Sequence, residues 1–290
     1  MKKLTGSLLV SFLLLAGLGT ALSQEKSGGM MGPPPVLVVY REVLKPGKMG
    51  MTHEKTESAF VQAYAKAKWP THYFAVDSLS GHPRSLFFVG YESFAAWEKD
   101  MLATQKDHVL AAALDRAGVA DGDLLSEAEG LVFAFNPKYS LRPTVDIAHM
   151  RYFEIEVFHV RPGHHNEWEE AVKLVMAAYE KMPDVHWDTF GTVYGGEDES
   201  YAIFTPLKSL AEVDKAFAQG KEFETNMGEE GMRKLRELER SAIASSSSQL
   251  FQFNPRMSYP PDAWIKADPD FWKPKMAAAP KKSEKEPTKQ

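Results

Sequence analysis

Near its middle the chain reads Leu131-Val132-Phe133-Ala134-Phe135-Asn136-Pro137-Lys138-Tyr139-Ser140, and near its end it reads Gln249-Leu250-Phe251-Gln252-Phe253-Asn254-Pro255-Arg256-Met257-Ser258. Aligned on Phe-Asn-Pro, the two copies lie 118 residues apart (136 to 254). Each begins with apolar residues at every second position, the side-chain period of a β-strand. Each then meets a proline, which has no N–H for a ladder, so we expect the strand to end there. The simplest interpretation is one closing strand in each of two successive units.

Both units predict the same order of elements before that strand. A strand, a helix, a hairpin of two strands and a second helix precede each closing strand, and Lys45-Pro46-Gly47 and Arg161-Pro162-Gly163 end the first strand of each unit. Ser93 is placed to cap the second helix of the first unit. The residues predict strands over 36–44, 71–77, 84–91, 152–160, 185–193 and 201–204, and helices from 51 to 69, from 93 to about 117, from 168 to 182 and from 210 to 238.

The order β-α-β-β-α-β gives a four-stranded antiparallel sheet with helices on one face. Valines and leucines occupy both alternating sets of positions over 36–39, so the other sheet face must also be covered, and two sheets in one chain can cover each other. The sequence thus predicts an α+β fold of two tandem ferredoxin-like βαββαβ repeats joined as a pseudo-dimeric α+β barrel. Over roughly 36–261 this resembles the dimeric α+β barrel superfamily, and the tandem form resembles its NIPSNAP-like and antibiotic-biosynthesis-monooxygenase-like branches.

The ends of the chain have their own compositions. Residues 1–23 have a basic start, a short apolar run and Ala21-Leu22-Ser23, the pattern of a signal peptide cleaved near Ser23. We therefore expect an exported protein, periplasmic or secreted, with no permanent membrane span. The predicted organisation is a signal peptide over 1–23, a linker over 24–35, a first repeat over 36–143, a connector over 144–150, a second repeat over 151–261, and a tail over 262–290 that is disordered from about 276.

Composition limits the chemistry and the partners. The chain of 290 residues has no cysteine, which excludes disulfides, thiolate metal sites and a cysteine nucleophile. Its formal net charge is −5, and no basic block interrupts the folded part, so we expect no nucleic-acid partner. A small apolar ligand and a homo-oligomer are compatible with the composition.

Histidines next to aromatic residues are the main candidates for a site. His72-Tyr73 and His186-Trp187 open the second strand of their respective units, 114 residues apart. A histidine there could polarise or deprotonate a bound molecule near neutral pH, whereas the plainer interpretation is a histidine at a strand end beside a core aromatic. Two further strand residues, Tyr40 and His159, complete the candidate ligand-binding set, and no residue is singled out as catalytic.

No metal and no cofactor are predicted. His165 and Glu169 share a helix face, but no third ligand is evident near them. Some haem-degrading proteins of the superfamily that the chain resembles carry a histidine ligand on the second helix, where this chain has His108. At the equivalent place of the second unit it has Glu224, so a solvent-facing histidine is the simpler interpretation.

Two classes of function are left. The first is a non-catalytic barrel that binds a small ligand or a partner. The alternative is a cofactor-independent oxygenase or an isomerase-like enzyme that acts on a small apolar or aromatic substrate with a histidine base. The sequence favours the non-catalytic class, because of the candidate polar residues only His72 and His186 recur in both units. No nucleophile elbow, phosphate-binding loop or dinucleotide-binding glycine motif occurs in the folded region, which argues against hydrolases, kinases and dinucleotide-binding enzymes.

Overall fold

The computed structural model describes residues 30–273. The predicted signal peptide, the first half of the predicted linker and the end of the tail predicted to be disordered lie outside these residues. Within 30–273, no helix combines the length and the apolarity needed to cross a bilayer.

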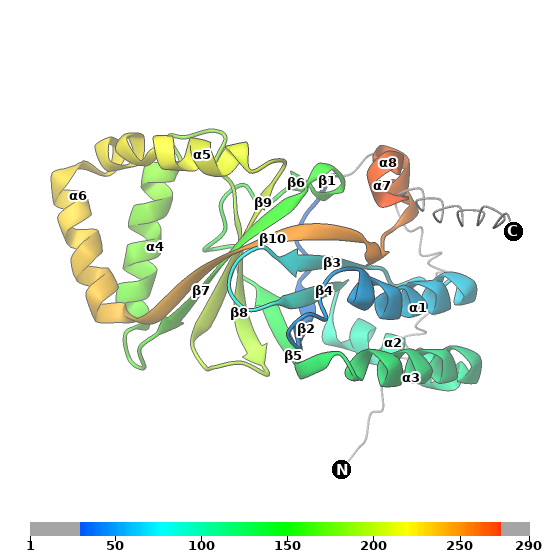
Figure 1. The fold of residues 1–290 in the computed structure, drawn as a ribbon. Helices are drawn as coiled ribbons and strands as arrows, with labels where there is room; N and C mark the ends of the chain where they lie inside the picture. Colours follow the sequence, from blue (N-terminus) through cyan, green and yellow to red (C-terminus); the bar gives the residue numbers. More distant parts are fainter. Residues whose placement is uncertain (1–29, 274–290) are drawn as a thin grey trace, which may run out of the picture.

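Eight strands close into one barrel, in the order β10-β3-β4-β2-β5-β8-β9-β7 (Figure 1). Each strand pairs with its neighbours in antiparallel register. A short ribbon of β1 and β6 is separate from the barrel. The strands are β1 (Met30–Met31), β2 (Val36–Leu44), β3 (Tyr73–Ser78), β4 (Arg84–Tyr91), β5 (Leu125–Phe135), β6 (Val145–Asp146), β7 (Tyr152–Val160), β8 (Asp188–Tyr194), β9 (Ser200–Leu207) and β10 (Ile243–Tyr259).

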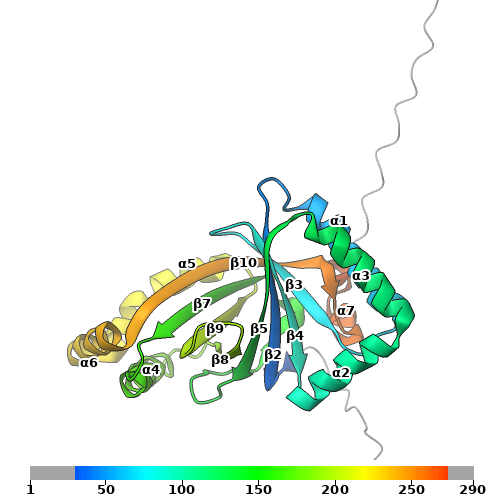
Figure 2. The same ribbon diagram turned by 90° about the horizontal axis from the view of Figure 1, so that it is seen from below.

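Helices cover the outside of the barrel in two groups. The first three lie over β2, β3, β4 and β5, and the next three lie on the far side over β7, β8 and β9 (Figures 1 and 2). Two short helices near the C-terminus pack at one end of the barrel. The helices are α1 (Met51–Ala67), α2 (Phe94–Lys106), α3 (His108–Gly122), the 3-10 turn η1 (Ile147–His149), α4 (His165–Tyr179), α5 (Ala211–Ala218), α6 (Gly220–Ala242), α7 (Asp262–Ala267) and α8 (Pro269–Trp272).

Two long strands join the two halves of the barrel. Strand β5 pairs with β2 along most of its length and with β8 at its C-terminal end. In the same way β10 pairs first with β7 and then with β3. The prediction of an α+β fold with the apolar sheet faces buried against each other is therefore confirmed, and the junction runs through the two strands that contain the repeated sequence.

Aromatic side chains fill the barrel. Phe88 of β4 lies with its ring centroid 5.6 Å from that of Phe204 on β9, and Phe74 of β3 lies 5.9 Å from Phe153 on β7. Phe251 and Phe253 of β10 are almost wholly buried in the same cluster, which Trp264 and Trp272 from the C-terminal helices extend. Because these rings pack at contact distance across the barrel, its interior is a core and the space for a ligand must be sought under the helices.

The helix boundaries follow local chemistry. Ser93 accepts a hydrogen bond from the amide of Ala96 at 3.1 Å, as its predicted capping role requires. The helix predicted to continue to about residue 117 is divided at Asp107, whose carboxylate caps α3 through the amides of Val109 and Leu110. The helix predicted from 210 to 238 is divided into α5 and α6, and within α6 Gly228 adopts φ +72°, which bends the helix.

The prediction that both closing strands end at Asn-Pro is right for β5, which ends at Phe135, and wrong for β10. Strand β10 passes through Pro255 to Tyr259, with a register shift against β3 after Asn254. A proline is tolerated there because the irregular segment does not require its N–H for the ladder. The hydroxyl of Ser258 instead accepts from the Ala75 amide on β3, at 2.9 Å.

Candidate functional site

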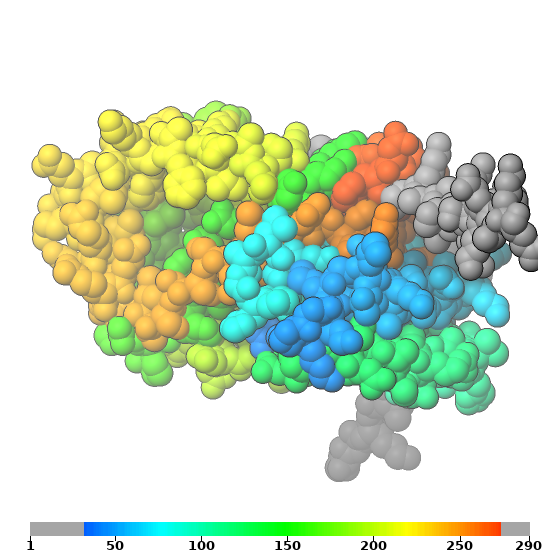
Figure 3. Space-filling model, viewed as in Figure 1, coloured from blue at the N-terminus to red at the C-terminus, as the bar shows by residue number. Residues whose placement is uncertain are grey.

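A cavity of about 250 Å³ lies between the second half of the barrel, strands β7, β8 and β9, and the helices α4, α5 and α6. Figure 3 shows the surface hollowed on this side, between the two yellow-to-orange helices and strand β10. The volume is near the lower end of the range of roughly 300–1,000 Å³ typical of small-molecule sites, so the cavity suits a small ligand. Its walls are mainly apolar side chains of α4 and of the helix-facing side of β7, β8 and β9.

Aromatic rings form one end of the cavity. Trp168 of α4 stacks on Tyr201 of β9 with ring centroids 5.3 Å apart, and it lies 5.2 Å from Phe158 of β7. The indole N–H of Trp168 is buried without a hydrogen-bond partner among the described residues. Since a buried donor without an acceptor is costly, this N–H could bind an acceptor on a ligand in the cavity.

Three carboxyl groups supply most of the polarity. Glu154 and Glu156 project from β7 toward the helices, and Glu239 reaches the cavity from α6. Burial, and secondarily the charge of Glu156, raises the pKa of Glu154, and burial also raises the pKa of Glu239. No lysine or arginine is among the described residues that line the cavity, and the charge of Arg236 only partly offsets the effect of burial on the pKa of Glu239. A carboxyl with a raised pKa in an apolar cavity can accept and return a proton closer to neutral pH.

Two of the predicted residues lie at this cavity. Trp187 is buried and donates its indole N–H to the Tyr139 carbonyl at 2.8 Å. His186 lies half-buried beside it, with Nε2 3.1 Å from the Pro206 carbonyl and Nδ1 3.3 Å from the Asp184 carbonyl. Both ring nitrogens therefore face backbone oxygens. These contacts fix the orientation of the imidazole and leave neither nitrogen free to act as a base.

His72 and Tyr73 occupy the equivalent place in the first half. The registers match, because Phe74 pairs with Phe88 in the first sheet as Asp188 pairs with Phe204 in the second. Aromatic rings, however, fill the space beside His72. The ring of His72 lies 4.7 Å from that of Tyr259, and Tyr73 packs in T-shaped contact with Tyr64 at 5.7 Å. Burial lowers the pKa of His72 and raises the pKa of Tyr73.

The other two predicted residues lie elsewhere. Tyr40 is half-exposed on the helix-facing side of β2. His159 alternates with the cavity residues of β7 and so faces the opposite way, with Nδ1 2.7 Å from the Ser200 hydroxyl and 3.1 Å from Glu197. The structure thus groups His186 with Trp187 and separates both from the remaining candidates. His108, considered as a haem ligand, is exposed at the start of α3.

Sequence reasoning missed Glu154, Glu156 and Glu239 as site residues. A signal was present for the first two, because Phe153-Glu154-Ile155-Glu156-Val157 alternates on a strand that should have helices over one face and a second sheet over the other. Carboxylates are uncommon on a covered sheet face unless they are paired with another polar group or a ligand. Glu239 gave no such signal, since it stands among many charged residues of a helix.

Comparison with known proteins identifies the fold. No protein-family model matches the chain, and a search of curated proteins finds no relative. Among solved structures, a candidate monooxygenase from Fusobacterium nucleatum subsp. nucleatum is similar, with a TM-score of 0.51 and 13% identity over 77% of this chain and 94% of that one. An anthrone oxidase-like protein is similar too, with a TM-score of 0.50 and 14% identity over 78% of this chain and 94% of the other.

The chain has the dimeric α+β-barrel fold. The resemblance expected from the sequence is confirmed at this level, and the likeness, at such low identity, extends to the fold alone. The sequence-based preference for a non-catalytic binding barrel is contradicted, because both neighbours are described by enzyme activities.

Proposed function

We propose that this protein is an enzyme acting on a small, mostly apolar or aromatic substrate bound in the cavity under α4, α5 and α6. The observation that carries the proposal is a carboxyl group with a raised pKa, that of Glu154, in a cavity whose other walls are largely apolar. Such walls exclude water from a substrate and leave a proton acceptor beside it. The names of the two structural neighbours agree with oxygenase or oxidase chemistry.

Glu154 is the proton acceptor in this proposal. Its carboxylate takes a proton from an acidified C–H of the substrate, which breaks the C–H bond and leaves an enolate among the apolar walls. His186 lies at the same cavity, but both of its ring nitrogens already face backbone carbonyls. We assign His186 to positioning the substrate, and this replaces the histidine base that the sequence suggested.

The enolate can then react with dioxygen. For an anthrone, the methylene carbon loses two hydrogens and gains one oxygen as a carbonyl, while the second oxygen atom leaves with both hydrogens as water. Anthrone and dioxygen thus give anthraquinone and water, with dioxygen as the oxidant. An isomerase would return the proton at another carbon and consume no oxygen, so oxygen uptake separates the two reactions.

The first test concerns the cavity. Binding of N-phenyl-1-naphthylamine, a neutral fluorescent aromatic probe, and its displacement by anthrone are measured on the protein. Ala216 is exposed on α5 and lines the cavity, so Ala216→Trp should obstruct it and weaken probe binding at least about 10-fold, a loss on the order of 1.4 kcal/mol. Ala218→Trp on the same helix is the matched control and should bind as wild type does. Equal binding by both variants would place the ligand elsewhere.

The second test concerns the reaction. Oxygen uptake with anthrone is measured for wild type, Glu154→Gln, His186→Gln and the exposed control Glu222→Gln. Removal of a general base typically costs about 100- to 10,000-fold, so Glu154→Gln should lose at least 100-fold in kcat while still binding the probe. His186→Gln should mainly raise KM. A Glu154→Gln enzyme that retains full activity would contradict the assignment.

We also propose that the two halves are tandem copies forming a pseudo-dimeric barrel of the NIPSNAP-like type. The matched strand registers and the twice-written Asn-Pro-x-x-Ser segment support this proposal. Expressing 36–143 and 148–261 separately tests it, since each half would expose one apolar sheet face and should not give a folded monomer. Two cooperatively melting monomers would contradict it.

Export and assembly are further parts of the proposal. The sequence of residues 1–23 supports cleavage near Ser23 and a periplasmic or secreted protein. N-terminal sequencing of material from the producing cells checks the cleavage, and a chain that still begins at Met1 would contradict it. A homo-oligomer is checked by light scattering.

A further inference from the structure

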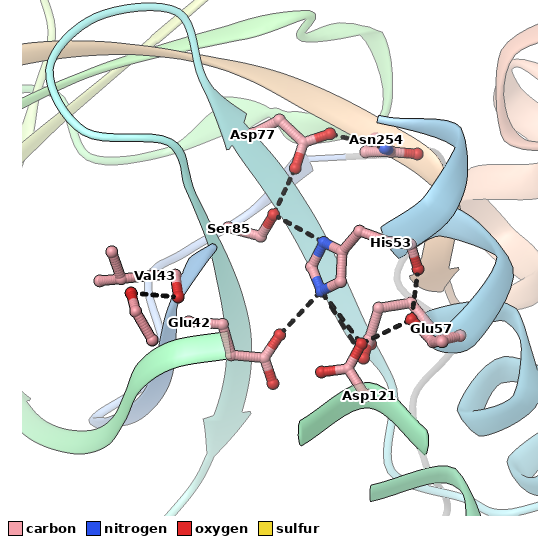
Figure 4. A network of polar contacts seen from close by, with 10 residues as sticks. Glu42, Val43, His53, Glu57, Asp77, Ser85, Asp121 and Asn254 are labelled. Carbon is pink, nitrogen blue, oxygen red and sulfur yellow. Dashed lines mark hydrogen bonds and ion pairs between the residues drawn. The ribbon is translucent and has the colours of Figure 1, made fainter. Parts of the chain in front are cut away.

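The first half contains a buried group of ionisable side chains on the other side of the barrel from the cavity. Glu42 comes from β2, His53 and Glu57 from α1, and Asp121 from the end of α3 (Figure 4). One potential ligand atom from each lies within 4.8 Å of all the others. His53, Glu57 and Asp121 are each at most 4% exposed. We call these four residues the His53 cluster.

The imidazole of His53 points at the three carboxyl groups. Its Nε2 lies 3.0 Å from Glu42 Oε2, 3.4 Å from Asp121 Oδ1 and 4.0 Å from Glu57 Oε1. Ligand atoms around an ion in tetrahedral geometry, at bond lengths of about 2.0–2.2 Å, are about 3.4 Å apart. The distances from Nε2 to the three carboxylate oxygens lie on both sides of this value, so the cluster can close around a small cation if its side chains move together.

The opposite nitrogen fixes the tautomer. Nδ1 of His53 lies 3.3 Å from the hydroxyl of Ser85, and that hydroxyl donates to Asp77 at 2.5 Å (Figure 4). Because the only hydroxyl proton is directed to Asp77, Ser85 must accept from Nδ1–H. In the neutral imidazole the lone pair is then on Nε2, facing three carboxyl groups. A lone pair in that position needs a cation or a second proton between it and the oxygens.

Glu57 gives an independent sign that a ligand is expected. Its side chain is directed into the cluster, it is 4% exposed, and its Oε1 has no hydrogen-bond partner among the described residues. A buried polar atom in that condition costs about 1–3 kcal/mol, and more if it is charged. Thr56 and Asn254, which satisfy other acids nearby, bond to Asp121 and Asp77 and not to Glu57.

The fold does not require polar residues here. In the second half, Phe158 pairs with Tyr201 as Glu42 pairs with Ser85 in the first, and its neighbours Trp168 and Val172 on α4 complete an apolar cluster. At this position the second half packs its first helix on the sheet with apolar side chains alone. Since burying several ionisable groups is expensive, the His53 cluster calls for a compensating interaction.

We propose that the His53 cluster binds one divalent cation through Nε2 of His53 and one carboxylate oxygen each from Glu42, Glu57 and Asp121. One imidazole with three carboxylates suits Zn²⁺, Mn²⁺ or Fe²⁺, whereas Ca²⁺ and Mg²⁺ favour oxygen ligands alone. With four protein ligands and almost no exposure, the site is closed and structural, and it ties α1 and α3 to β2. The linked Ser85 and Asp77 orient the histidine, as outer partners of metal-bound histidines do.

The experiment uses the full chain stripped with a chelator and dialysed. ZnCl₂ and MnCl₂ are titrated separately by calorimetry, and the melting temperature is measured with and without each metal. We expect one equivalent of tightly bound metal and a rise in melting temperature that grows with metal concentration. Glu57→Gln, which preserves shape, should weaken binding at least about 100-fold, and Ser85→Ala about 10- to 100-fold.

Two exposed residues supply matched controls, since His82→Gln and Glu127→Gln should bind metal as wild type does. Co²⁺ substitution gives a second readout, a visible spectrum that His53→Gln should change. Absence of binding by wild type at millimolar metal, or equal affinity in Glu57→Gln and Glu127→Gln, would overturn the site. The site would also be overturned if chelator-treated Glu57→Gln were more stable than wild type and neither protein responded to metal. That result would show that protons, and no metal ion, neutralise the buried carboxyl groups.

Discussion

The hydroxyl of Ser258 accepts a hydrogen bond from the backbone amide of Ala75 at 2.9 Å, across the junction between the two sheets. Ser258 also donates to the carbonyl of Asn254 at 2.7 Å. The other copy of the repeated segment does the same, since Ser140 accepts from the Thr189 amide and donates to the Asn136 carbonyl, both at 2.8 Å. The Asn-Pro-x-x-Ser segment is therefore a clamp that fastens each closing strand to the opposite sheet.

Removing either serine should loosen this junction. Ser258→Ala and Ser140→Ala each leave a buried amide without its acceptor, at an expected cost of about 1–3 kcal/mol in the free energy of unfolding. Ser247→Ala, on the exposed part of β10, should cost less than about 0.5 kcal/mol. Urea denaturation of the three variants measures the difference, and equal midpoints for all three would contradict the role of the clamp.

Asp188 should make stability depend on pH. It pairs with Phe204 on the inward face of β8, its Oδ1 has no partner among the described residues, and burial raises its pKa from the ordinary 3.8 to about 7. The folded state holds this proton more tightly than the unfolded state, so the contribution of Asp188 to stability falls as pH rises from about 4 to 7. The difference between those pKa values corresponds to at most about 4 kcal/mol.

Asp188→Asn should therefore be more stable than wild type at pH 8 and close to it at pH 4.5. Chemical denaturation at both pH values measures the change, with Asp115→Asn on the exposed face of α3 as the control. A difference between Asp188→Asn and wild type that is the same at both pH values would show that the carboxyl is solvated.

Substitutions in the two closing strands should destabilise the protein according to how deeply the side chain is buried. Phe253 is 2% exposed in the barrel core, so Phe253→Ala should cost about 3–5 kcal/mol. Phe135 packs against the same core but is only half-buried, so Phe135→Ala should cost less. Gln252→Ala, on the exposed face beside Phe253, is the control. Melting temperatures should follow this order, and a wild-type value for Phe253→Ala would rule out the packed interior.

Gly195 should tolerate no side chain. It adopts φ +83°, and a Cβ built on it would lie 2.2 Å from the carbonyl oxygen of Gly130 on β5. Gly195→Ala should thus force the β8–β9 turn away from β5. It should lower the free energy of unfolding by more than about 2 kcal/mol, because backbone strain and a steric clash add together. Gly47→Ala has a similar φ of +77° but open space around it, so it should show the backbone strain alone. Equal losses in denaturation would mean that the turn moves freely.

The sequence by itself determined the elements of this protein and their order. Alternating apolar residues, the capping serine at 93 and the proline-glycine stops at 46–47 and 162–163 are local signals, and each acts through its own backbone within a few residues. The duplicated Phe-Asn-Pro segment indicated two successive units, and the apolar side chains on both faces of 36–39 indicated that their two sheets must meet.

Only the tertiary structure decided where chemistry can occur. The His53 cluster joins residues 42, 53, 57 and 121, and the cavity joins β7 to α6, although these residues are far apart along the chain. The two halves have the same register at His72 and His186. The rings of Tyr64 and Tyr259 fill the space beside His72, whereas a cavity lies beside His186. Periodicity places a side chain on a face, but whether that face holds rings, a cavity or carboxyl groups depends on what packs across it, which residues distant in sequence determine.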